Sequence, residues 1–185
     1  MTDADSTPST SRDVLTVAIV AIIALMLGVN LFMFIDDGGE EPLVDGQAPA
    51  FELPVFDTDE TARLEDYRGQ VVVLDFWATW CPPCREQMPA LEEIATDPEF
   101  DGDLEVFSVN TDPQTDDRLE RIEEFLAEEN LTLPTLIDNG RVQGAYRAGT
   151  IPTLVVIDPD GEVTYRAAGL HDAPSLRELI RTASH

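Results

Sequence analysis

From residue 48 onward, hydrophobic positions form short runs separated by polar turns. Residues 71–77 are apolar at almost every position, a pattern typical of a central strand buried on both faces. Shorter apolar runs predict further strands at residues 51–56, 104–110, 136–137, 153–157 and 163–167. Apolar positions at helical spacing predict helices at residues 82–96, 116–129, 142–146 and 175–182. This alternation of strands and helices indicates an α/β domain.

Individual residues refine these elements. Pro89 lies inside the helix at residues 82–96 and should kink it. Residues 158–161, Asp-Pro-Asp-Gly, predict a turn between the last two strands. Asp172 or Ser175 is expected to cap the last helix. For the helix at residues 116–129, we expect one buried face made of Leu119, Ile122, Phe125 and Leu126.

The N-terminal part contains one long apolar segment. Residues 14–35 carry no charge, and a helix of this length covers the ~30 Å hydrocarbon core of a bilayer, so we expect a transmembrane anchor. The segment ends in Phe-Met-Phe-Ile at residues 32–35, a poor site for signal-peptide cleavage. No cysteine directly follows it, which argues against a lipid anchor. Residues 1–13 then form a disordered cytoplasmic tail, residues 36–47 an acidic tether and residues 48–185 the folded domain.

The charges beside the anchor predict its orientation. Arg12 is the only basic residue next to it, so the positive-inside rule favours an N-terminus in the cytoplasm. The domain is then expected on the outer, periplasmic side of the cytoplasmic membrane.

The chain as a whole is strongly acidic, with 37 acidic against 11 basic residues and a net charge of -26. All the basic residues are arginines. Such a surface repels nucleic acid and anionic lipid headgroups, so we expect no nucleic-acid partner. Solubility, or adaptation to high salt, explains the charge without a specific basic partner.

The two cysteines, Cys81 and Cys84, lie three positions apart, directly after the central strand and at the start of a helix. This spacing allows a small disulfide to close and reopen, and the N-terminal end of a helix favours a thiolate. We expect Cys81 to be the exposed attacking thiol and Cys84 the more buried resolving thiol. Pro82 and Pro83 suit the first helical turn, where the backbone N–H groups have no helical partner. A structural zinc site of cysteines and histidines would need both cysteines and both histidines of the chain, His171 and His185, and we favour the redox interpretation.

Asp75 is the one acidic residue inside the apolar run at residues 71–77. A carboxylate buried there without a partner is costly, and burial raises its pKa. In that state Asp75 could accept the proton of Cys84, directly or through water, as this thiol attacks. Alternatively, Asp75 lies at the end of a short strand and points to solvent.

Residues 73–85, Val-Leu-Asp-Phe-Trp-Ala-Thr-Trp-Cys-Pro-Pro-Cys-Arg, closely resemble the active-site strand and loop of thioredoxin-fold proteins. Residues 151–153, Ile-Pro-Thr, resemble the cis-proline loop of that fold, and Pro89 matches its kinking proline. Residues 48–54 and 64–70 are similar to the N-terminal hairpin and entry turn of the TlpA/ResA subfamily. The resemblance implies a central mixed sheet flanked by helices, an N-terminal β-hairpin and an inserted strand and helix at residues 104–129.

The resemblance also implies an activity, that of a membrane-tethered thiol-disulfide oxidoreductase with no cofactor beyond its redox-active disulfide and no metal. Pro152 would be cis, with Ile151 against Cys81, and the client would bind along residues Trp80, Pro82, Pro83, Ile151 and Pro152. The partners would be client proteins with disulfides, among them apocytochrome c during cytochrome c maturation, and a membrane thiol electron donor. We favour the reducing direction.

Two positions depart from the subfamily pattern. Members that act in cytochrome c maturation often have a glutamate three residues after the second cysteine, where this chain has Gln87. Many of them lack an acid at the position of Asp75, whereas classical thioredoxins have one. The proton-handling carboxylate therefore resembles that of thioredoxin, which weakens the cytochrome-specific interpretation and leaves the redox interpretation intact.

Three alternatives remain open. A copper chaperone of the same fold could bind Cu(I) through Cys81, Cys84 and His171. A thiol peroxidase would need Pro-x-x-x-Thr-x-x-Cys before its reactive thiol, but the corresponding positions here are Leu74 and Ala78. A non-enzymatic membrane-anchored interaction module would not need an intact set of Asp75, both cysteines and Pro152.

Overall fold

The computed structural model describes Val17 and residues 46–185. Except for Val17 and residues 46–47, the predicted tail, anchor and tether lie outside the described residues. Within the described ranges, no helix has both the length and the apolar character needed to span a bilayer. In chain order the elements are β1 (Glu52–Pro54), β2 (Thr61–Arg63), η1 (Leu64–Tyr67), β3 (Val71–Trp77), α2 (Pro82–Ala95), η2 (Pro98–Phe100), β4 (Leu104–Asn110), α3 (Arg118–Glu129), β5 (Thr135–Ile137), α4 (Arg141–Ala145), β6 (Thr153–Ile157), β7 (Val163–Ala168) and α5 (Ala173–Ala183).

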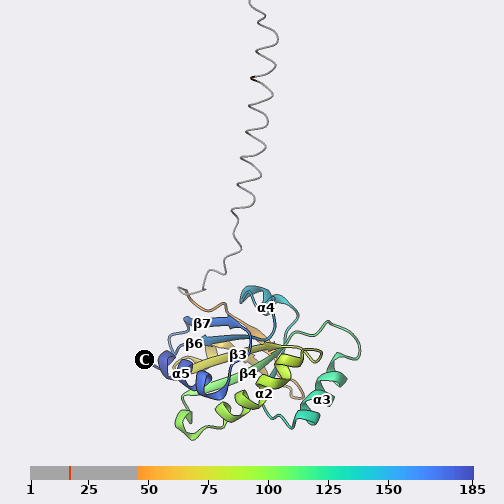
Figure 1. Cartoon of the computed structure of the whole chain (residues 1–185), viewed down its shortest axis with the longest axis horizontal. Helices are drawn as coiled ribbons and strands as arrows, with labels where there is room; N and C mark the ends of the chain where they lie inside the picture. Colours follow the sequence, from red (N-terminus) through yellow and green to blue (C-terminus); the bar gives the residue numbers. More distant parts are fainter. Residues whose placement is uncertain (1–16, 18–45) are drawn as a thin grey trace, which may run out of the picture. The chain divides into compact units, whose positions relative to one another are not determined.

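The central sheet has the strand order β5-β4-β3-β6-β7 (Figure 1). Strand β3 runs parallel to β4 and antiparallel to β6, so the sheet is mixed, as the resemblance implied. Strands β1 and β2 form a separate antiparallel hairpin. Because every residue of β3 is buried, the strand that precedes the two cysteines lies at the centre of the domain.

Two hydrophobic clusters lie on opposite faces of the sheet, because successive side chains of a strand point to opposite sides. Val73 and Trp77 of β3 belong to the cluster formed with α2, α3 and α5. Leu74 and Phe76 belong to the other cluster, formed with the β1–β2 hairpin and α4. Figure 1 shows α4 on the opposite side of the sheet from α2 and α3. By this alternation Asp75 points to the face that α2 covers.

The sequence predicted the bounds of β3, β4 and β6 correctly. Helix α5 begins after Asp172, whose carboxylate accepts a hydrogen bond from the Ser175 N–H at 3.0 Å, so Asp172 is the N-cap. In the turn before β7, Gly161 has a φ of +78°, a conformation that favours glycine, and its N–H donates to the Asp158 carbonyl at 2.9 Å. These local signals therefore had the predicted structural effect.

The predicted buried face of α3 is wrong at one residue. Leu119 is 54% exposed, whereas Ile122 and Phe125 are buried. The helix begins at Arg118, and that arginine, not Leu119, lies on the buried side with Ile122. Since successive residues of a helix differ by about 100° around its axis, burial of Arg118 turns Leu119 toward solvent.

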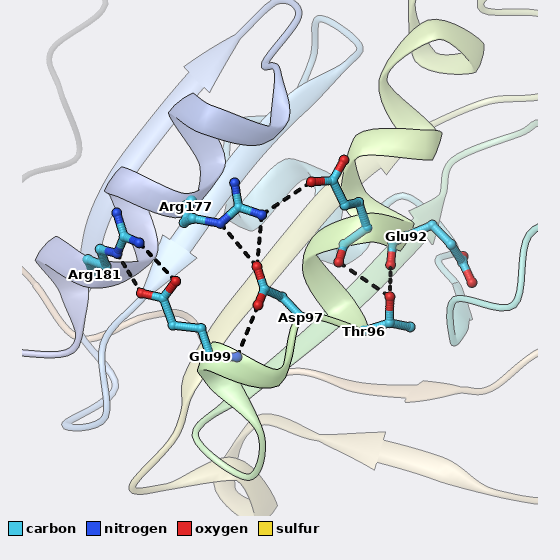
Figure 2. Close-up of polar contacts among 7 residues, drawn as sticks. Glu92, Thr96, Asp97, Glu99, Arg177 and Arg181 are labelled. Atoms are coloured by element: carbon cyan, nitrogen blue, oxygen red, sulfur yellow. Dashed lines mark hydrogen bonds and ion pairs between the residues drawn. The ribbon is translucent and has the colours of Figure 1, made fainter.

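Two arginines of α5 pair with carboxylates at the end of α2 and in the turn that follows (Figure 2). Arg177 contacts Asp97 at 2.8 Å and Glu93 at 3.2 Å. Arg181 contacts Glu99 through Nε at 2.6 Å. Asp97 also accepts a hydrogen bond from the Glu99 N–H at 3.0 Å. These contacts connect α5 to the C-terminal end of the helix that carries the two cysteines.

Arg177→Met should lower the melting temperature more than Arg181→Met. The Arg177–Asp97 pair is better shielded, with side-chain exposures of 23% and 16% against 49% and 40% for Arg181 and Glu99. Hydrogen bonds from the Glu99 N–H and from Arg177 lower the pKa of Asp97. The pairing therefore stabilises the fold above the unfolded-state pKa of this carboxyl and is lost as the pH falls through the folded-state value. Thermal unfolding at neutral and acidic pH tests both points, and equal losses for the two variants would contradict them.

Candidate active site

Cys81 and Cys84 form a disulfide with an S–S distance of 2.05 Å. Cys81 is the N-cap of α2, and its Sγ accepts a hydrogen bond from the Cys84 N–H at 3.2 Å. Pro82 and Pro83 occupy the first helical positions, as predicted, because they need no N–H there. The Cys81 sulfur therefore lies at the positive end of the helix, close to a backbone donor that can stabilise a thiolate.

The prediction that Cys81 is exposed is wrong for this disulfide state. Cys81 is 4% exposed and Cys84 is fully buried, so only the order of exposure is as expected. The cause is packing, since both cysteines belong to the core cluster beneath α2, and half-buried Ile151 packs against the same cluster. Trp80, by contrast, is 63% exposed, and Pro82 is also exposed. Two exposed side chains therefore flank the nearly covered Cys81 in the sequence.

The Ile151–Pro152 peptide bond is cis, as the resemblance implied. Pro152 is buried, and its carbonyl accepts a hydrogen bond from the Gly169 N–H at 2.9 Å. Within residues 46–185, the backbone N–H and C=O of Ile151 have no hydrogen-bond partner. These two groups lie just before β6 and can pair with an added extended segment.

Asp75 is fully buried, which excludes the alternative that it points to solvent. Its Oδ1 accepts a hydrogen bond from Gln87 Nε2 at 2.6 Å. Among the described residues, Oδ2 has no hydrogen-bond partner. Burial raises the pKa of Asp75 well above its ordinary value, and the Gln87 hydrogen bond opposes this rise. A buried acid with one unpartnered oxygen on the face covered by α2 can take up a proton released beneath this helix.

Gln87 was noted in the sequence only as a departure from the subfamily pattern, but it contacts two parts of the site. It lies one helical turn after Cys84 and is 1% exposed. Its Oε1 accepts a hydrogen bond from the His171 backbone N–H at 2.8 Å, while its Nε2 donates to Asp75. Gln87 thus joins the buried acid to the loop between β7 and α5.

The ring of His171 faces Tyr165. Its Nε2 lies 2.9 Å from the Tyr165 hydroxyl, and the two rings pack edge to face. Burial lowers the pKa of His171. Across residues 46–185, no three His, Cys, Asp or Glu side chains form a group that could bind a metal, so the structure does not bring His171 and the two cysteines together as the copper interpretation required.

A buried polar cluster that sequence reasoning missed holds the loop before Cys81. Asp112 accepts hydrogen bonds from the Thr79 N–H at 3.1 Å, the Thr79 hydroxyl at 3.2 Å and the Asn110 side-chain amide at 2.8 Å. Arg118 donates to the Asn110 side chain at 2.9 Å and to its carbonyl at 2.7 Å. The chain of contacts fixes Thr79, two residues before Cys81, to the end of β4.

Asp112→Ala should lower the free energy of unfolding by about 2–4 kcal/mol, because it leaves buried donors without an acceptor. Urea unfolding measures the loss, and Asp116→Ala, which removes an exposed carboxylate nearby, is the matched control. A loss no larger than that of the control would mean that this cluster does not hold the loop.

Trp77 is a core residue. It is fully buried, and its ring lies 4.6 Å from that of Phe125 in α3. Its neighbour Ala78, three positions before Cys81, is also fully buried. The peroxidase pattern needs a threonine at this position, and a buried alanine provides no hydroxyl.

Comparison with known proteins gives a family and a set of relatives. Residues 44–166 match the sequence profile of the AhpC/TSA family. The "Thiol-disulfide oxidoreductase ResA" of Geobacillus kaustophilus is 34% identical over 154 residues, which cover 82% of this chain and 84% of the relative. The "Thioredoxin-like protein YneN" of Bacillus subtilis is 36% identical over 118 residues, covering 63% of this chain and 66% of the relative.

Solved structures give the same fold. A protein of Chlorobium tepidum described as a thiol:disulfide interchange protein DsbE superimposes with a TM-score of 0.64 at 30% identity, covering 74% of this chain and 94% of the other. StoA of Bacillus subtilis superimposes with a TM-score of 0.60 at 24% identity, covering 71% of this chain and 96% of the other. The second likeness supports the fold alone.

Proposed function

The chain belongs to the AhpC/TSA family and is a thiol-disulfide oxidoreductase of thioredoxin type, and we propose that it reduces disulfides of client proteins while tethered to the outer face of the cytoplasmic membrane. The observation that carries this proposal is the Cys81–Cys84 disulfide at the N-terminal end of α2, on the same face of the sheet as buried Asp75. The sequence supports the tether through the uncharged segment at residues 14–35.

The reduced dithiol reacts in two steps. The Cys81 thiolate attacks one sulfur of the client disulfide, forming a mixed disulfide and releasing the other client sulfur as a thiolate. Cys84 then gives its proton to Asp75 and attacks the Cys81 sulfur, which releases the second client thiolate and closes the Cys81–Cys84 disulfide. Two electrons pass to the client, and the released thiolates take up protons. A membrane thiol donor must then reduce the enzyme disulfide again.

The client binds as an extended segment beside the disulfide. The free N–H and C=O of Ile151 pair with the client backbone, while Trp80 and Pro82 contact its side chains. Half-buried Pro83 completes this rim, whereas the predicted client contact of Pro152 is limited because its side chain is buried. Since the backbone contacts are independent of sequence, several clients can bind, and we propose oxidised apocytochrome c as one of them, as the sequence resemblance to the TlpA/ResA subfamily implies.

The reduction potential of the full-length protein in detergent, equilibrated against a reference thioredoxin, tests the direction. We expect a value near about -270 mV, as for thioredoxin. A value near about -120 mV would mean that the protein inserts disulfides, because this is the range of a strong oxidant. Reduction of an oxidised apocytochrome c peptide, compared with an unrelated disulfide peptide, tests the client, and equal rates would remove the cytochrome assignment.

The tether and orientation have a separate test. The protein should remain in isolated membranes after alkaline extraction. When the cytoplasmic membrane is intact, protease added on its outer side should cleave the domain but leave the N-terminal tail intact. Release by alkali would contradict the anchor, and protection of the domain would contradict the orientation.

A further inference from the structure

We propose that Gln87 is a positioning residue whose amide fixes which oxygen of Asp75 carries the proton during resolution of the mixed disulfide. The inference rests on the proposed function and deepens it. The amide lies between two partners, the Asp75 carboxyl in β3 and the His171 backbone N–H in the loop before α5. It is 1% exposed, so water does not compete for these hydrogen bonds.

The two partners determine how the amide is oriented. A backbone N–H can only donate, so the Gln87 atom that lies 2.8 Å from the His171 nitrogen must be the oxygen Oε1. The NH₂ group therefore faces Asp75, and it can only donate. The 2.6 Å contact with Asp75 is then a hydrogen bond in which Oδ1 is the acceptor.

This orientation decides where the Asp75 proton resides. A proton on Oδ1 would point at the Gln87 NH₂ group, donor against donor, so the neutral acid must carry its proton on Oδ2. Oδ2 is buried and has no hydrogen-bond partner among the described residues. It is thus the oxygen left free to take the proton of Cys84, while Oδ1 holds the Gln87 hydrogen bond in both protonation states.

The loop that orients Gln87 also contacts the client-binding loop. The Gly169 N–H donates to the Pro152 carbonyl at 2.9 Å, and two residues later the His171 N–H donates to Gln87. Both contacts use backbone groups, so they do not depend on the side chains of the loop. The same short segment therefore fixes the cis-proline loop and the amide that contacts Asp75.

Few titratable groups face Asp75 from the surrounding elements. Strand β6 contributes no titratable residue, and β4 contributes Glu105 at the far end, paired in register with Val72. Helix α2 contributes Cys84, which titrates only when reduced, and the His171–Tyr165 pair lies beyond Gln87. The charged groups of α2 and α5 lie on their outer, partly or fully exposed sides: Arg85, Glu86, Glu92, Glu93, Asp172, Arg177, Glu178 and Arg181.

Gln87→Met tests the inference, because it keeps the size of the side chain and removes the donor. The ionised form of Asp75 loses a hydrogen bond, so the pH below which resolution slows should rise by about one to two units. The measurement is stopped-flow release of the second thiolate from an aromatic disulfide by the reduced full-length protein. Carbon-13 NMR of the Asp75 carboxyl reports the same shift without turnover.

Gln87→Glu gives a second, independent variant. Its carboxylate still accepts the His171 N–H, but the oxygen that faces Asp75 must now carry a proton, so the two acids share one proton. Its pH limit should therefore also rise. Met88→Leu is the matched control, because Met88 is the next residue of α2, is fully buried and contributes no polar contact. We expect its profile to match that of the parent protein.

A double variant separates positioning from simple loss of packing. In an Asp75→Asn background, Gln87→Met should cause no further change in the resolution rate, because the group that it positions no longer titrates. An equal rate loss in both backgrounds, or an unchanged pH limit in Gln87→Met, would overturn the inference. If resolution by the unsubstituted protein does not slow at low pH, this would instead contradict the role of Asp75 in the proposed function.

Discussion

Replacing Cys84 with serine is expected to stop turnover and to trap clients. Cys81 still attacks a client disulfide, but the mixed disulfide has no second thiol to resolve it, so multiple turnover should fall by several orders of magnitude. Non-reducing electrophoresis of the full-length variant expressed in cells should show covalent adducts that disappear on reduction.

Cys81→Ser is the matched control. It removes the attacking sulfur and leaves Cys84 beneath the helix, so it should give neither turnover nor adducts. Adducts with Cys81→Ser and none with Cys84→Ser would reverse the assignment of the two thiols. Adducts with both variants would mean that Cys84 is accessible, contrary to its burial in the structure.

The parts of the fold that were predictable from sequence depend on local patterns. The run at residues 71–77 has one physical solution, a strand covered on both faces, and its predicted bounds are those of β3. The Cys-Pro-Pro-Cys segment likewise specifies a helix start, because two prolines fit only in the first turn. The cis bond at Pro152 came from the resemblance, since an X–Pro bond alone favours trans.

The parts that were not predictable depend on contacts between distant segments. Cys81 is buried because it packs into the core cluster beneath α2. Its position at the start of a helix suggested instead that it would be exposed. The Asp112 cluster unites Thr79 with Asn110 and Arg118, which are 31 and 39 positions away along the chain. One signal was present, since Asn110 and Asp112 follow the apolar run of the strand next to β3, where polar residues gather at the carboxyl edge of a parallel pair.

Gln87 shows why a resemblance cannot replace the contacts. In the resemblance to the subfamily, Gln87 is only a departure from a common glutamate. In the structure the same residue donates to an acid that many subfamily members lack, so the two departures, Gln87 and Asp75, form one hydrogen-bonded pair. In this chain the carboxyl lies on the strand and the amide on the helix.

Asp75→Asn is expected to slow the second chemical step and leave the first unchanged. The asparagine oxygen can still accept the Gln87 hydrogen bond, but it cannot take the proton of Cys84. Proton transfer by a positioned group contributes roughly 10²–10⁴-fold, so resolution near neutral pH should slow by about 10²-fold. Rapid-mixing experiments that separate the first and second thiolate release measure the two steps.

The same substitution should stabilise the folded protein at neutral pH. Burial raises the pKa of Asp75, so the native state holds its proton over a pH range in which the unfolded chain has released it. Stability therefore falls as the pH rises from the unfolded value of about 3.9 toward the folded value, by about 1.4 kcal/mol per unit of pKa difference. Asparagine cannot ionise, so Asp75→Asn should remove this fall in urea unfolding of the oxidised protein.

Ser108→Ala is the control for both measurements. Ser108 pairs with Asp75 in register on β4 and is fully buried, but its hydroxyl bonds to Thr135 at 2.8 Å. Loss of that hydroxyl should destabilise the protein equally at all pH values and leave both thiolate steps unchanged. If Asp75→Asn slows resolution without stabilising the protein, the substitution has distorted the site. If it stabilises the protein but leaves the second thiolate release unchanged, Asp75 is not the proton acceptor. Only a slower second step together with a flatter stability profile fits a buried acid whose ionisation is costly to the fold and necessary for resolution.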